Sequence, residues 1–296
     1  MSFRFPTDRT FVICEIGPNH DGSLETAKQL IDVAADAGAD CAKFQVKTPH
    51  MNLPPHLWNV ERETPWGRMT YIEYRQRIEL SPRDLLKVVE HCHKRNIIFS
   101  ASPWDLNSAD KLAVLGAPFI KIASASVTNL PLIEHVAKMH RPVVMSTGMS
   151  TYDEIDTAWK ILRAGVPQLA LLVCTSTYPA KPEDLNLERI RTFQFEFPDT
   201  VIGYSGHETG LYQTLCAVAM GAQVVERHIT LDRTRVGSDH AASVEPQGIK
   251  KLVKEIRNFE KARGSGEIRV LDCERKDLER LRGVQNPLTG ANQCGQ

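Results

Sequence analysis

The sequence lacks a net charge, a long apolar run and an export signal. Its 296 residues hold 36 lysines and arginines against 36 aspartates and glutamates, so the formal charge at pH 7 is zero. This balance excludes the basic surface typical of proteins that bind nucleic acid or anionic membranes. No apolar run approaches the roughly 20 residues that a membrane span needs. The first residues, MSFRFPTDRTF, also lack the apolar core of a signal peptide. We therefore expect neither a nucleic-acid partner nor a membrane partner.

Cysteine is too sparse for a disulfide framework. The seven cysteines are an odd number and show no dense spacing. Such usage is typical of a reducing compartment. Because the sequence also shows no export signal, it predicts a cytoplasmic protein. No short-period internal repeat is apparent either.

The chain does contain a regular alternation of apolar runs and helical patterns. Eight runs rich in apolar or β-branched residues end in polar clusters, and residues with helical spacing follow most of them. The runs cover residues 11–17, 41–46, 97–102, 117–126, 142–150, 169–179, 201–207 and 222–228. Eight such units in about 260 residues predict an α/β fold, a (β/α)8 TIM barrel. A doubly wound sheet is the alternative, but it does not require a polar cluster at the end of every strand.

Two stretches depart from this alternation. Residues 47–81 break the pattern and are rich in aromatic residues and arginines, so we predict a long functional or mobile loop there. After Gly264 the composition turns charged, and CERKDLERLRG has the spacing of a short amphipathic helix. We therefore place the barrel domain at residues 1–264. Residues 265–296 are expected to form a short, charged helical extension with a partly disordered tail.

Two histidines stand at the ends of neighbouring predicted strands. His207 closes the run VIGYSGH, and His228 closes AQVVERH. Because parallel strands bring their C-terminal ends to one face, the two imidazoles are placed to share a divalent metal. A lone histidine at such a position more often satisfies an ordinary hydrogen bond. The metal interpretation is favoured because Glu226, Asp239 and His240 lie close to the pair in the sequence.

Lysine and serine side chains mark the ends of other predicted strands. Lys43 and Lys121 suit a small phosphorylated anion, because they neutralise its charge while nearby serine hydroxyls donate to its oxygens. With a metal that polarises a carbonyl, this set suggests the joining of a phosphate-bearing substrate to an aldehyde. Simpler roles remain open: a lysine that pairs with a carboxylate such as Glu226, or a Ser-Thr-Gly turn that caps the next helix.

Seven sequence blocks, in this order, resemble the sialic acid synthases. That family includes N-acetylneuraminate synthase and the related legionaminic acid, pseudaminic acid and spore-coat polysaccharide enzymes. The blocks are FVICEIGPNHDGS, AGADCAKFQ, FIKIASAS, VVMSTGMS, VCTSTYP, VIGYSGH, and GAQVVERHITLDR with SDHAAS. The resemblance implies an enzyme that condenses phosphoenolpyruvate with an open-chain aldose, often an N-acylated hexosamine. The products would be a 2-keto-3-deoxy sugar acid and inorganic phosphate, and the enzyme would be a homodimer.

The resemblance also implies roles for individual residues. His207 and His228 look like ligands of a divalent metal that activates the aldehyde; Mn²⁺ is expected, with Mg²⁺ or Co²⁺ as alternatives. Glu15 looks like the acid/base group, and the rest of the expected catalytic set is Lys43, Lys121 and Asp239. The expected substrate contacts are Asn19, Gln45, Ser102, Ser124, Ser146, Tyr178 and Ser205.

The chain departs from the family pattern in three places. Family members commonly carry a C-terminal antifreeze-like domain that reaches into the partner's active site with an arginine. Too few residues follow Gly264 to build it, so we expect arginines of residues 47–81, such as Arg68, to replace its contacts. Ser126 stands where the family often has glutamate, and Gly206 where some members have an acid. Both changes argue against the usual N-acetylmannosamine as acceptor.

Two other functions fit the same barrel. A Schiff-base pyruvate aldolase would use Lys121 as its nucleophile. Borohydride with pyruvate would trap that adduct and a chelator would not inhibit, whereas the metal-dependent synthase predicts the opposite on both tests. A non-catalytic barrel that only binds a sugar acid is the third function, and the set Glu15, Lys43 and Lys121 with the two histidines argues against it.

Overall fold

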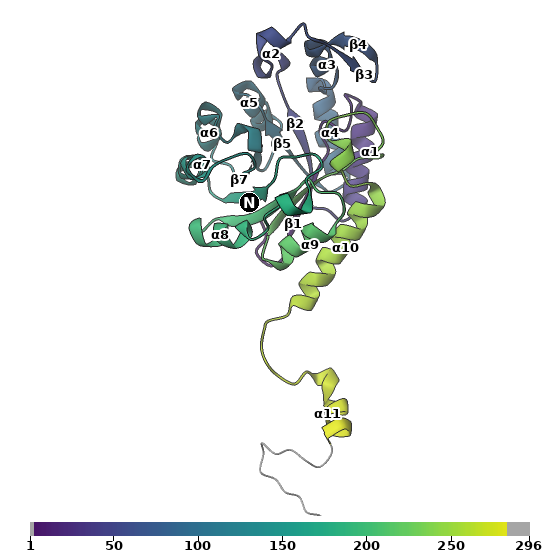
Figure 1. The fold of residues 1–296 in the computed structure, drawn as a ribbon, viewed down its shortest axis with the longest axis vertical. Helices are drawn as coiled ribbons and strands as arrows, with labels where there is room; N and C mark the ends of the chain where they lie inside the picture. Colours follow the sequence, from purple (N-terminus) through teal and green to yellow (C-terminus); the bar gives the residue numbers. More distant parts are fainter. Residues whose placement is uncertain (1–2, 283–296) are drawn as a thin grey trace, which may run out of the picture. The chain divides into compact units, whose positions relative to one another are not determined.

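The computed structural model describes residues 3–282, and its centre is a closed barrel of parallel strands. The strands follow one another around the barrel in the order β1-β10-β9-β8-β7-β6-β5-β2 (Figure 1). This arrangement confirms the predicted (β/α)8 barrel. The strands are β1 Phe11–Glu15, β2 Cys41–Val46, β5 Ile98–Pro103, β6 Ile120–Ile122, β7 Val143–Ser146, β8 Leu169–Cys174, β9 Val201–Gly206 and β10 Val224–His228.

Helices between the strands cover the outside of the barrel, and local sequence signals set where several of them begin. Ser23 caps the first helix by accepting from the backbone N–H of Thr26, and Ser81 caps another that has Pro82 at its first position. Apolar residues of the helices pack on the outer faces of the strands in one large core. The helices are α1 Leu24–Asp36, α4 Pro82–Lys94, α5 Leu106–Val114, α6 Leu130–Ala137, α7 Tyr152–Gly165, α8 Arg189–Glu196, α9 Tyr212–Ala219 and α10 Pro246–Arg263.

A cluster of phenylalanines closes the N-terminal end of the barrel. Phe11 begins β1 and Phe119 directly precedes β6, and their ring centroids lie 5.9 Å apart. Phe5 packs against both, at 5.4 Å from each ring centroid. Aromatic packing at this end leaves the C-terminal end, where the polar strand ends gather, as the open end.

Residues 47–81 are folded, so the prediction of one long loop was wrong. They form α2 Pro49–Asn52, a 3₁₀ turn, a hairpin of β3 Glu61–Thr64 and β4 Gly67–Thr70, and α3 Tyr71–Arg77. In Figure 1 these elements lie together at one side of the barrel. The hairpin strands read ERET and GRMT and are largely exposed. The apolar alternation by which strands are recognised is therefore missing from their sequence.

The predicted strands extend too far at several C-terminal ends. The run expected at 117–126 contains only the three-residue strand β6, and a 3₁₀ turn follows at Ser124–Ser126. The oxygen of Ser124 accepts from the backbone N–H of Gly148 at 3.0 Å, so this turn is tied to the end of the next strand. A sequence pattern does not reveal where ladder hydrogen bonds give way to such side-chain bonds.

Residues up to Phe259 form one compact unit, and the chain from Glu260 forms a second. In the described part of the second unit, a 3₁₀ turn at Asp272–Glu274 precedes helix α11 Arg275–Arg282. This confirms the short charged helix predicted for the segment CERKDLERLRG. The last residue of that segment and the tail that was expected to be disordered lie outside the described residues. Between residues 3 and 282, no helix has the length and apolar character needed to cross a bilayer.

Candidate active site

A cavity of about 600 Å³ opens at the C-terminal ends of the barrel strands. Glu15 ends β1, Ser146 ends β7 and His228 ends β10, and all three line this cavity. Apart from Asn19, every residue predicted for the site lines it as well. The full set of these residues is Glu15, Lys43, Gln45, Ser102, Lys121, Ser124, Ser146, Tyr178, Ser205, His207, His228 and Asp239.

Asn19 lies behind the cavity wall. Its side-chain amide donates to the carbonyl of Ile229 at 2.9 Å and to the hydroxyl of Ser243 at 2.8 Å. Asn19 is almost fully buried, and these bonds tie the loop after β1 to the loop after β10. Its observed contacts are therefore structural ones.

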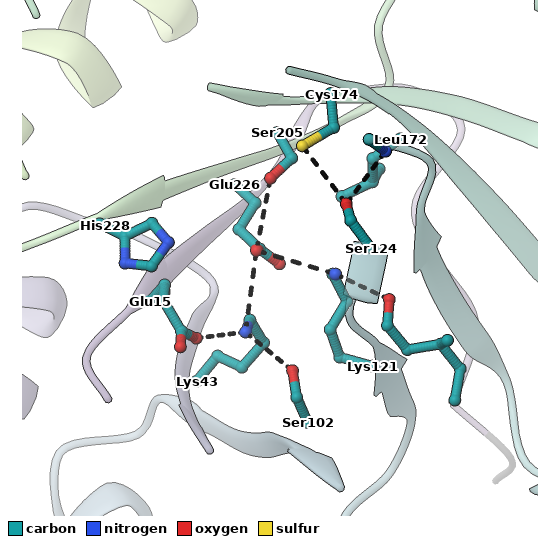
Figure 2. Close-up of polar contacts among 12 residues, drawn as sticks. Glu15, Lys43, Ser102, Lys121, Ser124, Leu172, Cys174, Ser205, Glu226 and His228 are labelled. Atoms are coloured by element: carbon teal, nitrogen blue, oxygen red, sulfur yellow. Dashed lines mark hydrogen bonds and ion pairs between the residues drawn. The ribbon is translucent and has the colours of Figure 1, made fainter. Parts of the chain in front are cut away.

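Two lysines and two glutamates form the charged floor of the cavity (Figure 2). The ammonium of Lys43 forms an ion pair with Glu15, which lies opposite it in the β1–β2 ladder, and lies 3.7 Å from Oε1 of Glu226. Lys121 Nζ lies 3.9 Å from the same Glu226 oxygen. All four side chains are almost fully buried. Glu226, which the sequence suggested as a possible lysine partner and as a neighbour of the histidine pair, therefore links the two lysines.

Burial and mutual attraction shift the pKa values of this floor in opposite directions. Burial raises the pKa of Glu15 to about 7, although the charge of Lys43 opposes the shift. Burial also favours a raised pKa for Glu226, but Lys121 and Lys43 outweigh it and the pKa is lowered. Burial lowers the pKa of Lys121, whereas for Lys43 the two carboxylates outweigh burial and raise the pKa. Near neutral pH, Glu15 is thus the floor group best suited to exchange a proton.

Serine hydroxyls surround the lysines on the same floor. Ser102 accepts from Lys43 Nζ at 3.1 Å, and Ser205 donates to Glu226 at 3.5 Å. The hydroxyl of Ser146 is buried and has no hydrogen-bond partner. Because an unpaired buried hydroxyl is costly, Ser146 is a natural donor to a bound anion. The floor thus combines two ammonium groups with hydroxyls that face the cavity.

The two predicted metal ligands lie side by side in the cavity wall. The ring centroids of His207 and His228 are 5.3 Å apart, and the Tyr178 ring packs against both at 4.1 and 5.6 Å. His207 Nδ1 lies 2.8 Å from the carbonyl of Thr175 and donates there, so in the neutral ring Nε2 carries the free lone pair. His228 Nδ1 lies 3.3 Å from Oδ2 of Asp239. Burial lowers the pKa of His228 well below its usual value, which keeps this imidazole neutral.

These residues fit a metal held only partly by protein. Within residues 3–282, no group of three or more histidine, cysteine, aspartate or glutamate side chains is arranged to hold a metal ion. Two imidazoles are nevertheless a recognised ligand set for borderline divalent metals once both are neutral, with water or substrate in the other positions. Burial lowers the pKa of His207, but its contact with Cys174 outweighs burial and the pKa is raised, so a metal would have to displace a proton there. Nδ1 of His228 is also buried and makes no hydrogen bond. The donor chemistry therefore suits a site that substrate completes.

A buried ion pair behind the histidines was missed by the sequence analysis. Glu208 and Arg227, which are adjacent in sequence to His207 and His228, have almost no exposed surface. A Cβ atom added at Gly206 would lie 2.7 Å from Oε2 of Glu208 and 2.8 Å from the Tyr204 ring. The acid found at position 206 in some family members therefore has no room here, which explains one of the departures.

The residues named for the other two departures do not line the cavity, so the expectation that Arg68 contacts the substrate was wrong. Ser126 is buried in the 3₁₀ turn after β6 and does not line the cavity. Arg68 points to solvent, where it pairs with Glu61 at 2.7 Å, and it does not line the cavity. The cations of the same segment that do line it are Arg62 and Arg75, with Lys47 beside them. The abundance of arginine in residues 47–81 was the available signal, but without the fold it did not indicate which arginines face inward.

Comparisons with known proteins agree with this geometry. The sequence profile described as the NeuB family matches residues 30–268. N-acetylneuraminate-9-phosphate synthase of Homo sapiens is 42% identical over 92% of this chain and 76% of the relative, and N,N'-diacetyllegionaminic acid synthase of Campylobacter jejuni is 37% identical over 93% and 83%. The crystal structure of N-acetylneuraminic acid (sialic acid) synthetase from Leptospira borgpetersenii, in complex with citrate, is 33% identical. It has a TM-score of 0.81 and covers 93% of this chain and 92% of that one.

Proposed function

This chain belongs to the NeuB family, and on that premise we propose that it joins phosphoenolpyruvate to an open-chain aldose. It is an enzyme of the sialic acid synthase type. The observation that carries the proposal is that one cavity is lined both by two lysines, Lys43 and Lys121, and by a pair of adjacent histidines, His207 and His228. The lysines suit an enol phosphate, and the histidines suit the aldehyde that it attacks.

The reaction forms one carbon–carbon bond and breaks one carbon–oxygen bond. C3 of phosphoenolpyruvate attacks C1 of the aldehyde, whose oxygen becomes a hydroxyl. Water adds at C2, and phosphate then leaves with the bridging oxygen, which yields the 2-keto-3-deoxy acid. The lysines Lys43 and Lys121 and the hydroxyls of Ser102, Ser146 and Ser205 are the proposed contacts of the phosphate and carboxylate groups.

Glu15 is the proposed base for the water that adds at C2. Its carboxyl accepts from Gln45 Nε2 at 2.9 Å and pairs with Lys43, so it is held in one position on the floor. Its pKa of about 7 places the acid and the base forms at similar abundance near neutral pH. Such a group takes a proton from water in one step and returns it in another.

His207 and His228 are the residues that would hold a divalent metal, expected to be Mn²⁺. A metal bound there would polarise the aldehyde and stabilise negative charge on its oxygen. The carbonyl of Thr175 holds the His207 ring in orientation, and the carboxylate of Asp239 lies 3.3 Å from Nδ1 of His228. Tyr178 packs on both rings and lines the cavity, where its hydroxyl is a proposed contact for the acceptor.

Membership of the family indicates a sugar acceptor but does not specify whether that sugar carries a phosphate. The human relative is named for a product with a 9-phosphate, and the Campylobacter relative for N,N'-diacetyllegionaminic acid. Both names support an N-acylhexosamine-like aldose, but they disagree on whether a phosphate is present. Cytoplasmic location and a homodimeric state complete the proposal as family-based expectations.

A Schiff-base pyruvate aldolase is the second candidate, because burial lowers the pKa of Lys121. A lysine with a lowered pKa is more often neutral and thus nucleophilic. However, Lys121 Nζ donates to the carbonyl of Ile122 at 3.0 Å and lies near Glu226, which holds it as a cation. Family membership also argues against a barrel that only binds a sugar acid.

Phosphate release tests the proposal. The enzyme is incubated with phosphoenolpyruvate and Mn²⁺ together with a panel of free and phosphorylated aldoses. We expect one member of the panel to give phosphate and a 2-keto acid in equal amounts, and a chelator to abolish both. Reductive trapping of pyruvate on Lys121, with no chelator effect, would instead establish the aldolase.

A further inference from the structure

The loop between β10 and α10 forms part of the cavity wall. It covers residues 229–245, and Val236, Ser238 and Asp239 of this loop line the cavity. One carboxylate oxygen of Asp239 lies 3.3 Å from Nδ1 of His228, and the other accepts from the hydroxyl of Ser238 at 2.6 Å. The conformation of the loop therefore decides whether a carboxylate faces this proposed metal ligand.

Backbone hydrogen bonds fix the two ends of the loop but not its middle. The N–H of Val244 donates to the carbonyl of His228 at 2.7 Å, and the N–H of Thr230 donates to that of Val244 at 3.1 Å. Residues 232–239 lie beyond these bonds, and all of them are exposed except Arg235 and Asp239. An exposed segment of this kind needs side-chain contacts to keep one conformation.

One ion pair joins the middle of the loop to another part of the chain. Nη2 of Arg235 lies 2.8 Å from Oδ2 of Asp21, which belongs to the loop between β1 and α1. Between residues 3 and 282, no other hydrogen bond or ion pair links residues 234–238 to a segment outside the β10–α10 loop. The middle of the loop is thus tied to the barrel through Asp21.

The position of Asp21 suits this contact. Its φ of 50° is a left-handed conformation that aspartate and asparagine adopt more readily than most residues. Its second oxygen, Oδ1, lies 3.6 Å from Nε2 of His240, which is buried and has no hydrogen-bond partner. A Cβ atom added at Gly237 would lie 2.6 Å from Cδ2 of the same ring. The middle of the loop therefore lies directly on His240, and the carboxylate of Asp21 lies next to both.

Other charged residues of the loop do not provide the same tie. Asp232 is the second acid near Arg235, but it accepts from the backbone N–H and the hydroxyl of Thr234 at 2.8 and 2.7 Å. Arg233 donates to the carbonyl of Ala241 at 2.7 Å. Both contacts lie within the loop, so they shape it without attaching it to the rest of the barrel.

We propose that Asp21 is a positioning residue that holds the β10–α10 loop in place through Arg235. In this conformation the carboxylate of Asp239 faces His228. This role rests on the proposed function, because it takes His228 as a metal ligand. Without the ion pair, the middle of the loop is displaced in a fraction of the molecules, and Ser238 then no longer holds the carboxylate of Asp239. The apparent affinity for metal falls with the fraction of molecules in which the loop is in place.

Trypsin measures how often the loop leaves its place. The protease cleaves after Arg235 only when that side chain is released. Metal-free Asp21→Asn should therefore be cut there about threefold faster than the wild type or more, as the loss of a partly exposed ion pair gives. Asparagine keeps the left-handed backbone and removes the charge. Asp199→Asn is the matched control, because Asp199 also has a left-handed φ, of 58°, and pairs with Arg163 at 3.1 Å.

Two results of this experiment overturn the proposal. One is an equal rate of cleavage after Arg235 in the wild type and in Asp21→Asn. The other is an equal rise in cleavage after Arg191 on α8, because it would mean that the whole fold opens more often.

Mn²⁺ affinity tests the consequence at the metal site. Free Mn²⁺ is followed by electron paramagnetic resonance without substrate. We expect the Kd to rise about threefold or more in Asp21→Asn and in Arg235→Gln, and by no more in the double variant, because both changes remove one contact. Asp199→Asn should match the wild type. A Kd that is unchanged in both single variants, or that changes equally in the control, overturns the role of Asp21, and so do losses that add in the double variant.

The two measurements separate this role from the proposed function. Faster cleavage together with weaker Mn²⁺ binding supports it whether or not any aldose consumes phosphoenolpyruvate. If the wild type binds no Mn²⁺, the role at His228 fails together with the metal part of the proposed function, and cleavage after Arg235 still shows whether Asp21 holds the loop. If the wild type binds Mn²⁺ and releases phosphate while Asp21→Asn matches it in both measurements, the role of Asp21 is overturned and the proposed function stands.

Discussion

Arg227 and Glu208 form a buried ion pair that joins the two strand ends bearing the histidines. Nη1 of Arg227 donates to Oε1 of Glu208 at 3.0 Å, and Nη2 donates to the Glu208 carbonyl at 2.7 Å. Tyr204 donates its hydroxyl to Oε2 of Glu208 at 2.8 Å. Because Glu208 follows His207 and Arg227 precedes His228, this pair adds a side-chain link between the chain segments that carry the two imidazoles.

Removing one member of this pair should destabilise the protein strongly. Arg227→Met leaves the carboxylate of Glu208 buried without a cation, which costs about 3–5 kcal/mol. Urea denaturation measures this loss in the free energy of unfolding. Arg191→Met is the control, because Arg191 pairs with Glu188 in solvent at 3.1 Å and should cost less than about 1 kcal/mol. Equal losses in the two variants would show that the buried pair has no special role.

The absence of a side chain at Gly206 should make room for the carboxylate of Glu208 in the same ion pair. Gly206→Ala places a Cβ atom 2.7 Å from Oε2 of Glu208, so we expect a loss of about 1–3 kcal/mol through overpacking. In a Glu208→Ala background the contact with Oε2 is removed while the one with the Tyr204 ring at 2.8 Å remains, so the same substitution should cost less. A double-mutant cycle by urea denaturation measures the difference. Additive losses would mean that Gly206 does not make room for Glu208.

Glu15 should set the acidic limb of the pH–activity profile. Burial raises its pKa to about 7, so the fraction in the base form, and with it kcat, should fall as the pH drops below about 7. Glu15→Gln should lower kcat by about 10²–10⁴-fold and remove that limb. Stopped-time assays of phosphate release from pH 5 to pH 9 provide the profile. A variant that is slow but keeps the wild-type limb would assign the titration to another group.

The histidine pair should bind Mn²⁺ without any substrate. Free Mn²⁺ measured by electron paramagnetic resonance should fall when wild-type protein is added, but much less with His207→Ala or His228→Ala. His135→Ala is the control, because His135 pairs with Asp110 at the surface at 2.7 Å. If the control variant and the cavity variants bind the ion equally, the metal lies elsewhere.

Much of the fold and the floor of the site was predictable from the sequence. A buried parallel strand needs apolar residues, and the polar side chain that ends it must face the open end of the barrel. For this reason Lys43, Lys121, His207 and His228 were singled out, and the structure gathers them in one cavity. Their roles in catalysis remain predictions.

The wall of the site was less predictable, because its residues carry no periodic signal. Arg62 sits on an exposed polar hairpin, and which of its faces points to the cavity depends on the register of β3 with β4. Arg227 looked like one charged residue in a buried run, and its partner Glu208 became evident only when β9 and β10 were paired. Asn19 was expected to contact substrate on the basis of the family resemblance, which does not distinguish a side chain that faces the cavity from one that ties two loops together.

Oxygen labelling tests the central claim most directly. Phosphoenolpyruvate that carries ¹⁸O at the bridge between C2 and phosphorus is incubated with the enzyme, Mn²⁺ and the best acceptor. The reaction derived from this cavity breaks the carbon–oxygen bond, so the released phosphate should contain the label. Released phosphate without the label, or sugar acid formed from pyruvate with no phosphate released, would contradict it.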